Sequence, residues 1–456
     1  MRTAAIFSRK PSAISAINLS NHITPLSIME STESLSSTPL TAAPTTAPTA
    51  SDDPRLAPLA KGDKHIWGIY ILLVIISIVE LYSASSREVV SAGMGVYGTI
   101  IRHGAMLLAG FGIICLLQRT HYRTILRWIP VFALMSVAMM VYTMFFGSYI
   151  NGARRSFNLF FISIQPSEFI KISAAMMVAL IMSRFQLKGG GVDSKAVAAT
   201  AIVIMVFGGL LLPQGLTNTL LLMAISLSMM IISGAGKKLF VVLLVYGACC
   251  GVYLAVSHND SDSRSGTWKE RIESFIGNGK PKYEEPITSD NRQEMLGYIA
   301  QAHGGVTGVL PGNSRETSRL PLAFTDYIYS IVVEELGLWG GISVLVLYLW
   351  LLGRASTIAS RCSRAFPALL VIGMALVIVF QALFHICIVT GVIPVSGQPL
   401  PLISKGGSSI LVTSIAFGIM LSVSRFAVRN SSKKREINNE IEMLPEEVRA
   451  DNPSQL

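Results

Sequence analysis

Long apolar stretches recur along this chain, and they constrain its fold more than any other feature. An apolar helix needs about 20 residues to cross the hydrocarbon core of a bilayer. The pattern therefore predicts an all-α polytopic membrane protein with about ten transmembrane helices. The sixth run is short and follows Pro213, so we expect one or two of the helices to be tilted or partial. The ten runs lie at about 66–85, 98–117, 128–146, 166–184, 196–212, 219–234, 239–256, 326–353, 366–392 and 406–425.

The overall composition also indicates a membrane protein. Hydrophobic residues make up 51% of the chain and charged residues only 14%, whereas soluble proteins carry about 25% charged residues. The five cysteines lie in or beside apolar runs, and their spacing matches neither metal ligands nor disulfide pairs. We interpret them as membrane-buried hydrophobic residues, and no metal site is predicted from side chains alone.

The distribution of lysine and arginine predicts the orientation. With a cytoplasmic N-terminus, the alternate loops that face the cytoplasm and the parts of the tails next to the first and last runs hold 18 Lys and Arg residues. The short outer loops and their helix ends hold five, which are Arg87, Arg102, Arg154, Arg155 and Lys405. Lys and Arg concentrate in the cytoplasmic loops of membrane proteins. Both termini are therefore predicted to be cytoplasmic, and the net charge of +10 is explained without a nucleic-acid partner.

Three segments flank or interrupt the predicted membrane domain at 63–428. Residues 1–62 are rich in Ser, Thr, Ala and Pro and are predicted to be disordered. They are read as a cytoplasmic tail, as an organelle transit peptide, or as an extension upstream of a true start at Met29. Residues 429–456 form a cytoplasmic tail. The long loop at 257–325, between the seventh and eighth helices, is predicted to lie outside and to contain a helix near 290–303, capped by Ser289 or Asp290.

The outer stretch between the third and fourth runs carries two cations against the general charge trend. A pair of arginines, Arg154 and Arg155, would suit an anionic lipid or a pyrophosphate, although a surface pair at the headgroup level is an equal alternative. Gln165 then precedes the next helix. Glu168 and Lys171 are three residues apart and can pair on one helix face. A structural role is sufficient for that pair, but ionisable groups at membrane depth are also functional candidates.

The end of the long loop and the start of the eighth run hold the sharpest cluster of motifs. Glycines around Asn313 allow another chain or a ligand to approach closely. Asp326 lies at the mouth of the eighth run and could act as a general base. The alternative is that it supports the helix N-terminus together with Thr325. Glu334 and Glu335 lie two turns deeper, and at least one is expected to face the bundle interior.

The last outer loop contains three prolines at 394, 399 and 401, which predict a rigid, non-helical crossing. Non-helical backbone near a membrane is tolerated where it lines a cavity. Lys405 is a lone cation there, beside the glycine pair at 406–407 and the hydroxyl pair Ser408 and Ser409.

Taken together and in this order, these motifs resemble the SEDS family (shape, elongation, division and sporulation), which includes FtsW and RodA. The resemblance covers residues 66–425, and the Gly-Asn-Ser triplet favours the FtsW-like branch. Its markers are Asn151-Gly152-Ala153-Arg154-Arg155, Gln165-Pro166-Ser167-Glu168 with Lys171, Gly312-Asn313-Ser314, Leu320-Pro321 with Thr325-Asp326, Glu334-Glu335-Leu336-Gly337, and Pro399-Leu400-Pro401 with Ser404 and Gly406-Gly407-Ser408-Ser409.

The resemblance implies a peptidoglycan glycosyltransferase at the outer face of a bacterial cytoplasmic membrane. It would polymerise lipid II, an undecaprenyl-pyrophosphate-linked disaccharide peptide, into β-1,4 glycan strands, in septal wall synthesis for the FtsW-like branch. Asp326 matches the family's essential aspartate and would be the general base. The candidates for substrate binding are Arg154, Arg155, Lys171, Glu168, Lys405, Asn313, Ser408 and Ser409, and those for support are Glu334, Glu335 and Gln165.

The resemblance also implies a cofactor and partners. A Mg²⁺ or Mn²⁺ ion held mainly by the substrate pyrophosphate would leave little trace in the sequence. The expected partners are a class B penicillin-binding protein transpeptidase and other divisome membrane proteins.

Several positions depart from the family's usual residues. Ser156 replaces a frequent Trp, Phe324 replaces a His, and Ser396 replaces a Thr. The acidic-Gly-Thr stretch after the fifth run reads Pro213-Gln214-Gly215-Leu216-Thr217-Asn218.

Three other functions compete with the glycosyltransferase. A lipid II flippase needs a polar path across the whole membrane, but the ionisable residues cluster near the outer face. A divisome scaffold that activates its transpeptidase has less need of a carboxylate at position 326. A solute transporter often shows inverted repeats, and no clear repeat is present.

Overall fold

The structure is a computed structural model that describes residues 62–92, 96–150, 153–159, 162–187, 191–257, 275, 286–288, 291–320, 323–362 and 364–443. Several sequence-based predictions lie outside these residues. They include the disorder of residues 1–61, the alternative start, the cap at 289–290 and the end of the C-terminal tail. The Asn151-Gly152 and Pro321 positions also lie outside.

Each of the ten predicted apolar runs coincides with a long helix. Eight helices in the described part of the chain are long and apolar enough to cross a membrane, while α6 and the apolar part of α7, Val242–Gly251, are shorter. This agrees with the expectation of one or two partial spans. The ten helices are α1 (Lys64–Ala92), α2 (Val96–Arg119), α3 (Tyr122–Phe146), α4 (Pro166–Arg184), α5 (Ser194–Leu211), α6 (Leu216–Ile232), α7 (Leu239–Ser257), α10 (Ile328–Ser360), α11 (Ala365–Val389) and α12 (Gly407–Glu442).

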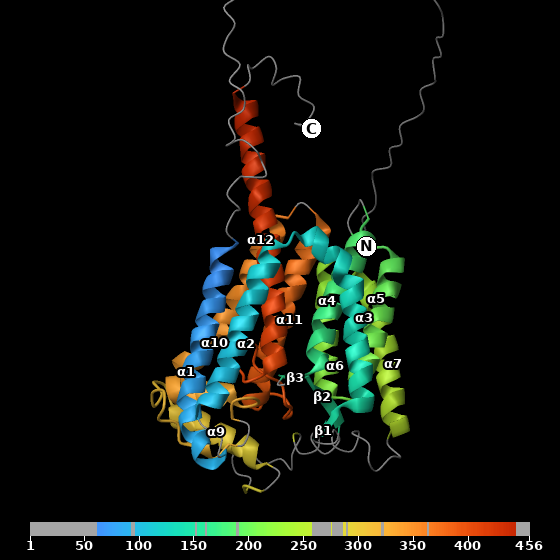
Figure 1. Cartoon of the computed structure of the whole chain (residues 1–456). Coiled ribbons are helices and arrows are strands. Elements are labelled where there is room, and N and C mark those ends of the chain that lie inside the picture. Colours follow the sequence, from blue (N-terminus) through green and yellow to red (C-terminus); the bar gives the residue numbers. More distant parts are fainter. Residues whose placement is uncertain are drawn as a thin grey trace, which may run out of the picture. The chain divides into compact units, whose positions relative to one another are not determined.

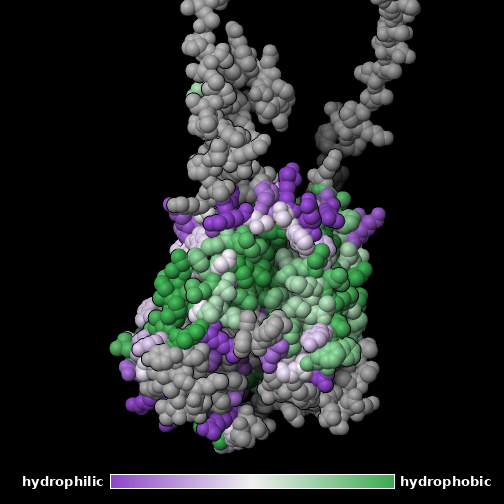
Figure 2. All heavy atoms as spheres, viewed as in Figure 1, coloured by the Kyte–Doolittle hydropathy of each residue, from purple (hydrophilic) through white to green (hydrophobic). Residues whose placement is uncertain are grey.

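The long helices run side by side and form one bundle (Figure 1). Apolar side chains form a belt around the middle of the visible face, and hydrophilic side chains gather at both ends (Figure 2). Helices α4 and α11 form its centre: α4 packs against α3, α5, α6 and α11, and α11 also contacts α10 and α12. Small residues allow this close packing in a membrane. At Gly373 of α11, for example, an added Cβ would lie 2.7 Å from Met229 of α6.

We call the two ends of the bundle the basic end and the loop end. The basic end holds Arg119, Arg184, Arg364 and the first turn of α3. The loop end holds the start of α4, α10 and α12 and the segments between α3 and α4, between α5 and α6, and between α11 and α12. A sheet of three short antiparallel strands also lies there, which the sequence did not lead us to expect. Its order is β1 (Ser148–Ile150), β2 (Ala153–Leu159), β3 (Ile162–Ile164).

Helix α4 begins at the loop end for reasons that its sequence makes clear. Proline occupies its first position, where a missing N–H costs no hydrogen bond, and Glu168 lies in its first turn. An acidic residue there interacts favourably with the positive end of the helix dipole. Arg184 in the last turn interacts favourably with the negative end.

Helix α10 is broken at Gly337, where φ is +72°. A break within a span leaves backbone groups that lipid cannot satisfy. Here the loop that precedes α10 satisfies them: the N–H groups of Val309 and Leu310 donate to the carbonyls of Glu334 and Glu335, at 3.0 and 2.8 Å. This loop follows α9 (Arg292–Gly304), which packs against α10. The presence of α9 confirms the helix predicted near 290–303.

Replacing Gly337 with alanine should destabilise the protein strongly. The added Cβ would clash with Val306 O, lie 2.5 Å from Gly308 N and sit on a backbone with φ of +72°. Gly353→Ala is the matched control, because it lies on the same helix and an added Cβ there would meet no atom within 4 Å. Thermal unfolding of the detergent-solubilised protein should show a large loss of Tm for Gly337→Ala and little change for Gly353→Ala. Equal Tm values for the two variants would contradict this explanation of the break.

Candidate functional site

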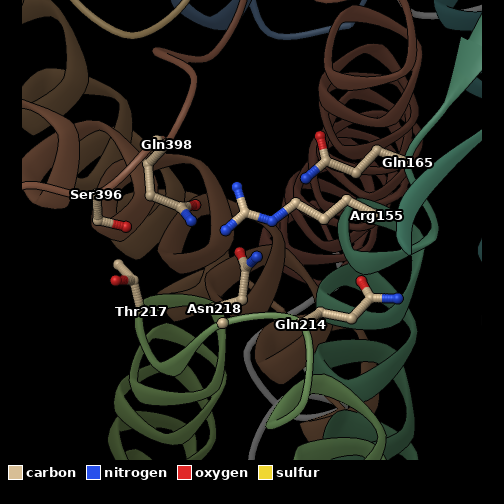
Figure 3. Close-up of a pocket in the computed structure, with 9 residues that line it drawn as sticks. Arg155, Gln165, Gln214, Thr217, Asn218, Ser396 and Gln398 are labelled. Atoms are coloured by element: carbon tan, nitrogen blue, oxygen red, sulfur yellow. The ribbon is translucent and has the colours of Figure 1, made fainter. Parts of the chain in front are cut away.

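A small polar pocket opens at the loop end, where three separate parts of the chain meet. Strand β2 supplies Arg155, and Gln165 precedes α4. The remaining lining comes from the turn before α6, from the first turn of α6 and from the loop between α11 and α12, and comprises Gln214, Gly215, Thr217, Asn218, Ser396, Gly397 and Gln398. The Arg155 guanidinium reaches between the amides of Gln398 and Asn218 (Figure 3). The pocket therefore presents one cation surrounded by amides and hydroxyls.

Asp326 lies beside this pocket, in the turn that precedes α10. A Cβ at the pocket residue Gly397 would lie only 2.9 Å from Asp326 Oδ2, so the carboxylate directly faces the loop between α11 and α12. Burial raises the pKa of Asp326, and the positive charge of Arg155 partly opposes that rise. The structure thus brings Arg155, one of the candidate substrate-binding cations, close to Asp326, the residue that the resemblance implies as general base.

The loop at 394–405 touches the Asp326 turn through its backbone. Lys405 N donates to Phe324 O at 2.8 Å, and Ser404 Oγ donates to Thr325 O at 2.8 Å. Ser404 Oγ also accepts a hydrogen bond from Leu400 N at 2.7 Å, and this bond closes a tight turn that follows Pro399. These bonds hold the loop and the turn that carries the carboxylate as one unit.

Side chains from the bundle interior bind the other side of this loop. Tyr348 donates to Pro401 O at 2.6 Å, and Gln381 donates to Pro399 O at 3.2 Å. His385 Nδ1 lies 2.6 Å from Gln398 O. Buried backbone carbonyls require such donors from the protein.

Glu168 and Lys171 belong to this internal network, and Lys171 does not reach the pocket. Its ammonium is completely buried, 2.7 Å from Glu168 Oε1 and 3.1 Å from Gln381 Oε1. Gln381 in turn holds the Pro399 carbonyl. Both residues were predicted to bind substrate, but this geometry supports a positioning role behind the loop.

The other candidate residues for substrate binding are spread over the loop end. Arg154 alternates with Arg155 along β2, is exposed, and bonds to the carbonyls of Met144 (3.3 Å) and Phe145. Asn313 is exposed and bonds to Val309 O at 3.0 Å. Neither residue lines the pocket.

The hydroxyl pair at the start of α12 is buried. Ser408 Oγ accepts from Gln165 N at 3.3 Å and so connects the hydroxyl pair to the pocket wall. Ser409 Oγ has no hydrogen-bond partner among the described residues. Lys405 is half-buried behind the turn.

Glu334 and Glu335 are both fully buried, so both face the interior, as was expected for at least one. Glu334 accepts hydrogen bonds from Arg315 N and His303 Nδ1, each at 2.9 Å, and from Ser314 Oγ at 2.5 Å. Glu335 accepts one from Gly312 N at 3.3 Å. These bonds anchor the loop at 303–317 to α10.

Two groups of residues were not anticipated from the sequence. The pocket amides Asn218 and Gln398 are more than nine-tenths buried, and their carbonyl oxygens have no hydrogen-bond partner among the described residues. Asn218 lies at the start of α6 and Gln398 in the loop before α12, and no spacing rule predicts that these two segments line one pocket. Glu80 is fully buried within α1, and neither carboxyl oxygen has a hydrogen-bond partner in the described part of the chain. A glutamate inside an apolar run can be seen in the sequence, and such a residue is a candidate for a functional role.

The comparisons with known proteins agree with this fold. A family model described as "Cell cycle protein", FTSW_RODA_SPOVE, matches residues 63–429. "Probable peptidoglycan glycosyltransferase FtsW" of Dichelobacter nodosus is 30% identical over 82% of this chain and 94% of its own length. "Peptidoglycan glycosyltransferase MrdB" of Escherichia coli is 28% identical over 78% of this chain and 91% of its own.

Solved structures share the same fold. The structure of Thermus thermophilus "Rod shape determining protein RodA" matches with a TM-score of 0.57 and 22% identity, over 80% of this chain and 97% of that one. A chain from the structure "Structural coordination of polymerization and crosslinking by a peptidoglycan synthase complex" matches with a TM-score of 0.64 and 23% identity. The match covers 81% of this chain and 99% of that one.

Replacing only Lys171 of the buried ion pair should lower the stability of the protein more than replacing both Lys171 and Glu168. Lys171→Met leaves the Glu168 carboxylate buried without its partner, which typically costs about 3–5 kcal/mol. Adding Glu168→Gln should recover much of the lost Tm, because no buried charge then remains. The measurement is the Tm of both variants in detergent. A double variant no more stable than Lys171→Met would argue against a buried ionised pair.

Proposed function

The chain belongs to the FtsW/RodA/SpoVE family, whose model matches it over residues 63–429, and we propose that its loop-end pocket polymerises lipid II into β-1,4 glycan strands. Relatives named peptidoglycan glycosyltransferase align with it over more than nine-tenths of their own length, and the protein is a peptidoglycan glycosyltransferase of cell-wall synthesis. The observation that carries the proposal for the site is a half-buried carboxylate, Asp326, beside a polar pocket with one arginine.

The protein is a multi-pass membrane protein, and its orientation is part of the proposal. Cationic residues concentrate at the basic end, including Arg119, Arg123, Arg184 and Arg364. The positive-inside rule then assigns that end and both termini to the cytoplasm of a bacterium and the loop end to the outer face. Lipid-linked precursor displayed outside the membrane would meet the pocket there.

In the proposed reaction, Asp326 accepts the proton of the acceptor's sugar 4-hydroxyl. The hydroxyl oxygen bonds to the donor's anomeric carbon with inversion. The bond from that carbon to the lipid pyrophosphate breaks, and its electron pair leaves on the pyrophosphate. Arg155 offsets the charge that develops on this leaving group. The raised pKa of Asp326 suits a general base, because base strength increases with pKa.

The pocket amides complete the proposed site. Asn218 and Gln398 present carbonyl oxygens that would accept hydrogen bonds from sugar hydroxyls or N-acetyl groups. The described residues contain no cluster of three or more His, Cys, Asp and Glu side chains able to hold a metal. A Mg²⁺ or Mn²⁺ ion held mainly by pyrophosphate oxygens fits a site with a single nearby carboxylate. When bound, it would neutralise charge on the leaving group.

We further propose a class B penicillin-binding protein as partner, together with other divisome membrane proteins. A structural neighbour comes from a complex whose title couples polymerisation to crosslinking. A role in division is favoured by the Gly312-Asn313-Ser314 triplet. Relatives named FtsW, MrdB and "Stage V sporulation protein E" match at similar identity, so they do not separate division from elongation.

The direct test is glycan-chain formation from purified lipid II by the complex with its candidate transpeptidase. Asp326→Asn should lower the rate by about a hundredfold or more, the usual contribution of a general base. Asp193→Asn, at the N-cap of α5 on the basic end, should retain activity. Equal polymer from Asp326→Asn and wild type would exclude the base role. No polymer from an intact wild-type complex would favour a scaffold or a flippase.

The pH dependence offers an independent test. A general base works only when deprotonated, so activity should rise with pH through the pKa of Asp326, above the ordinary value of 3.8. Arg155→Met removes the charge that lowers this pKa, so the acidic limb of kcat/KM should move to higher pH. A variant with weaker binding but an unmoved acidic limb would show that Arg155 does not act on Asp326.

A further inference from the structure

A second cavity, of about 570 Å³, opens at the basic end, far along the bundle from the pocket described above. Ligand-binding pockets usually have volumes of about 300–1,000 Å³. Three helices form it: the first two turns of α3, the end of α4 and the start of α11. Its lining residues are Tyr122, Arg123, Leu126, Arg127, Pro130, Arg184, Arg364, Phe366 and Pro367.

Four exposed arginines surround this cavity. Arg123 and Arg127 lie one turn apart on α3, Arg184 ends α4, and Arg364 immediately precedes α11. Within the described residues, no ion pair joins any of them to a carboxylate. The positive-inside rule accounts for each arginine separately. That rule does not explain why four arginines from three helices lie around one cavity, where their like charges repel one another.

The floor of the cavity is apolar. The rings of Tyr122 and Phe366 are buried, with centroids 6.4 Å apart, and Leu126, Pro130 and Pro367 extend the surface. Helices α3 and α11 also begin here, and helix N-termini favour negative charge. A cationic rim above an apolar floor matches the two parts of a phospholipid, with its phosphate at the rim and an acyl chain on the floor.

We propose that this cavity is a binding site for an anionic phospholipid of the leaflet that contacts the basic end. The headgroup phosphate binds Arg123, Arg127, Arg184 and Arg364, and an acyl chain covers Leu126 and Phe366. Basic pockets between transmembrane helices bind lipids such as cardiolipin in this way. The site is separate from the loop-end pocket, and the inference holds whatever reaction that pocket performs.

The test measures lipid binding to the purified full-length protein by native mass spectrometry and by thermal shift. Cardiolipin should bind and raise the Tm, whereas phosphatidylcholine should not. The variant Arg123→Gln/Arg184→Gln/Arg364→Gln should bind cardiolipin roughly a hundredfold more weakly, given about 1 kcal/mol per basic residue near a membrane surface. The matched control, Arg119→Gln/Lys195→Gln/Arg361→Gln, removes the same charge from exposed residues of the same end that do not line the cavity. It should bind like the wild type.

Two further arms keep the proposal falsifiable. Leu126→Trp narrows the floor without changing charge, and it should weaken cardiolipin binding even if the triple arginine variant fails to fold. Inorganic phosphate should not reproduce the thermal shift, because it lacks the acyl chain. Equal loss of binding in the cavity variant and the matched control would overturn the proposal in favour of general surface charge. A full shift with inorganic phosphate alone would show a simple anion site rather than a lipid site.

Discussion

Hydrogen bonding inside lipid is the constraint on which this structure depends. Backbone groups within a membrane have no water to bind, so any non-helical segment must find its donors and acceptors in the protein. The loop at 394–405 meets this requirement through Tyr348, Gln381 and His385, which reach the carbonyls of Pro401, Pro399 and Gln398. Its three prolines suit this arrangement, because a proline has no N–H to satisfy.

The position of the candidate site follows from that arrangement. Ser404 and Lys405 connect the loop to the turn at 323–326, so the carboxylate of Asp326 and the pocket residue Gly397 are held face to face. The buried pair of Glu168 and Lys171 supports the loop from behind through Gln381. A glycosyl transfer needs its base and its charge-compensating cation in fixed geometry. Glu168, Lys171 and Gln381 would help to fix that geometry without contacting the substrate.

The features that depend on local pattern could be predicted from the sequence. The ten apolar runs predicted ten helices because hydrophobic length alone decides whether a segment spans a membrane. The motifs also placed Asp326 and Arg155 at the same end. Prediction fell short where three-dimensional packing decides. The complete burial of Lys171 does not follow from its spacing to Glu168, and Asn218 in α6 and Gln398 in the loop before α12 line one pocket only because distant parts of the chain come together. The sheet that carries Arg155 was also missed: β1 and β3 have only three residues each and carry almost no periodic signal, and β2 contains two adjacent arginines rather than an apolar alternation.

The measurement that tests the central claim most directly is a structure, by electron cryomicroscopy, of the Asp326→Asn variant in complex with its transpeptidase and lipid II. We expect the lipid pyrophosphate within about 3 Å of the Arg155 guanidinium. We also expect a sugar between Asn218 and Gln398, with a hydroxyl within about 3.2 Å of the side chain at position 326. Lipid II bound elsewhere on the protein, with the loop-end pocket unchanged, would contradict the proposed site.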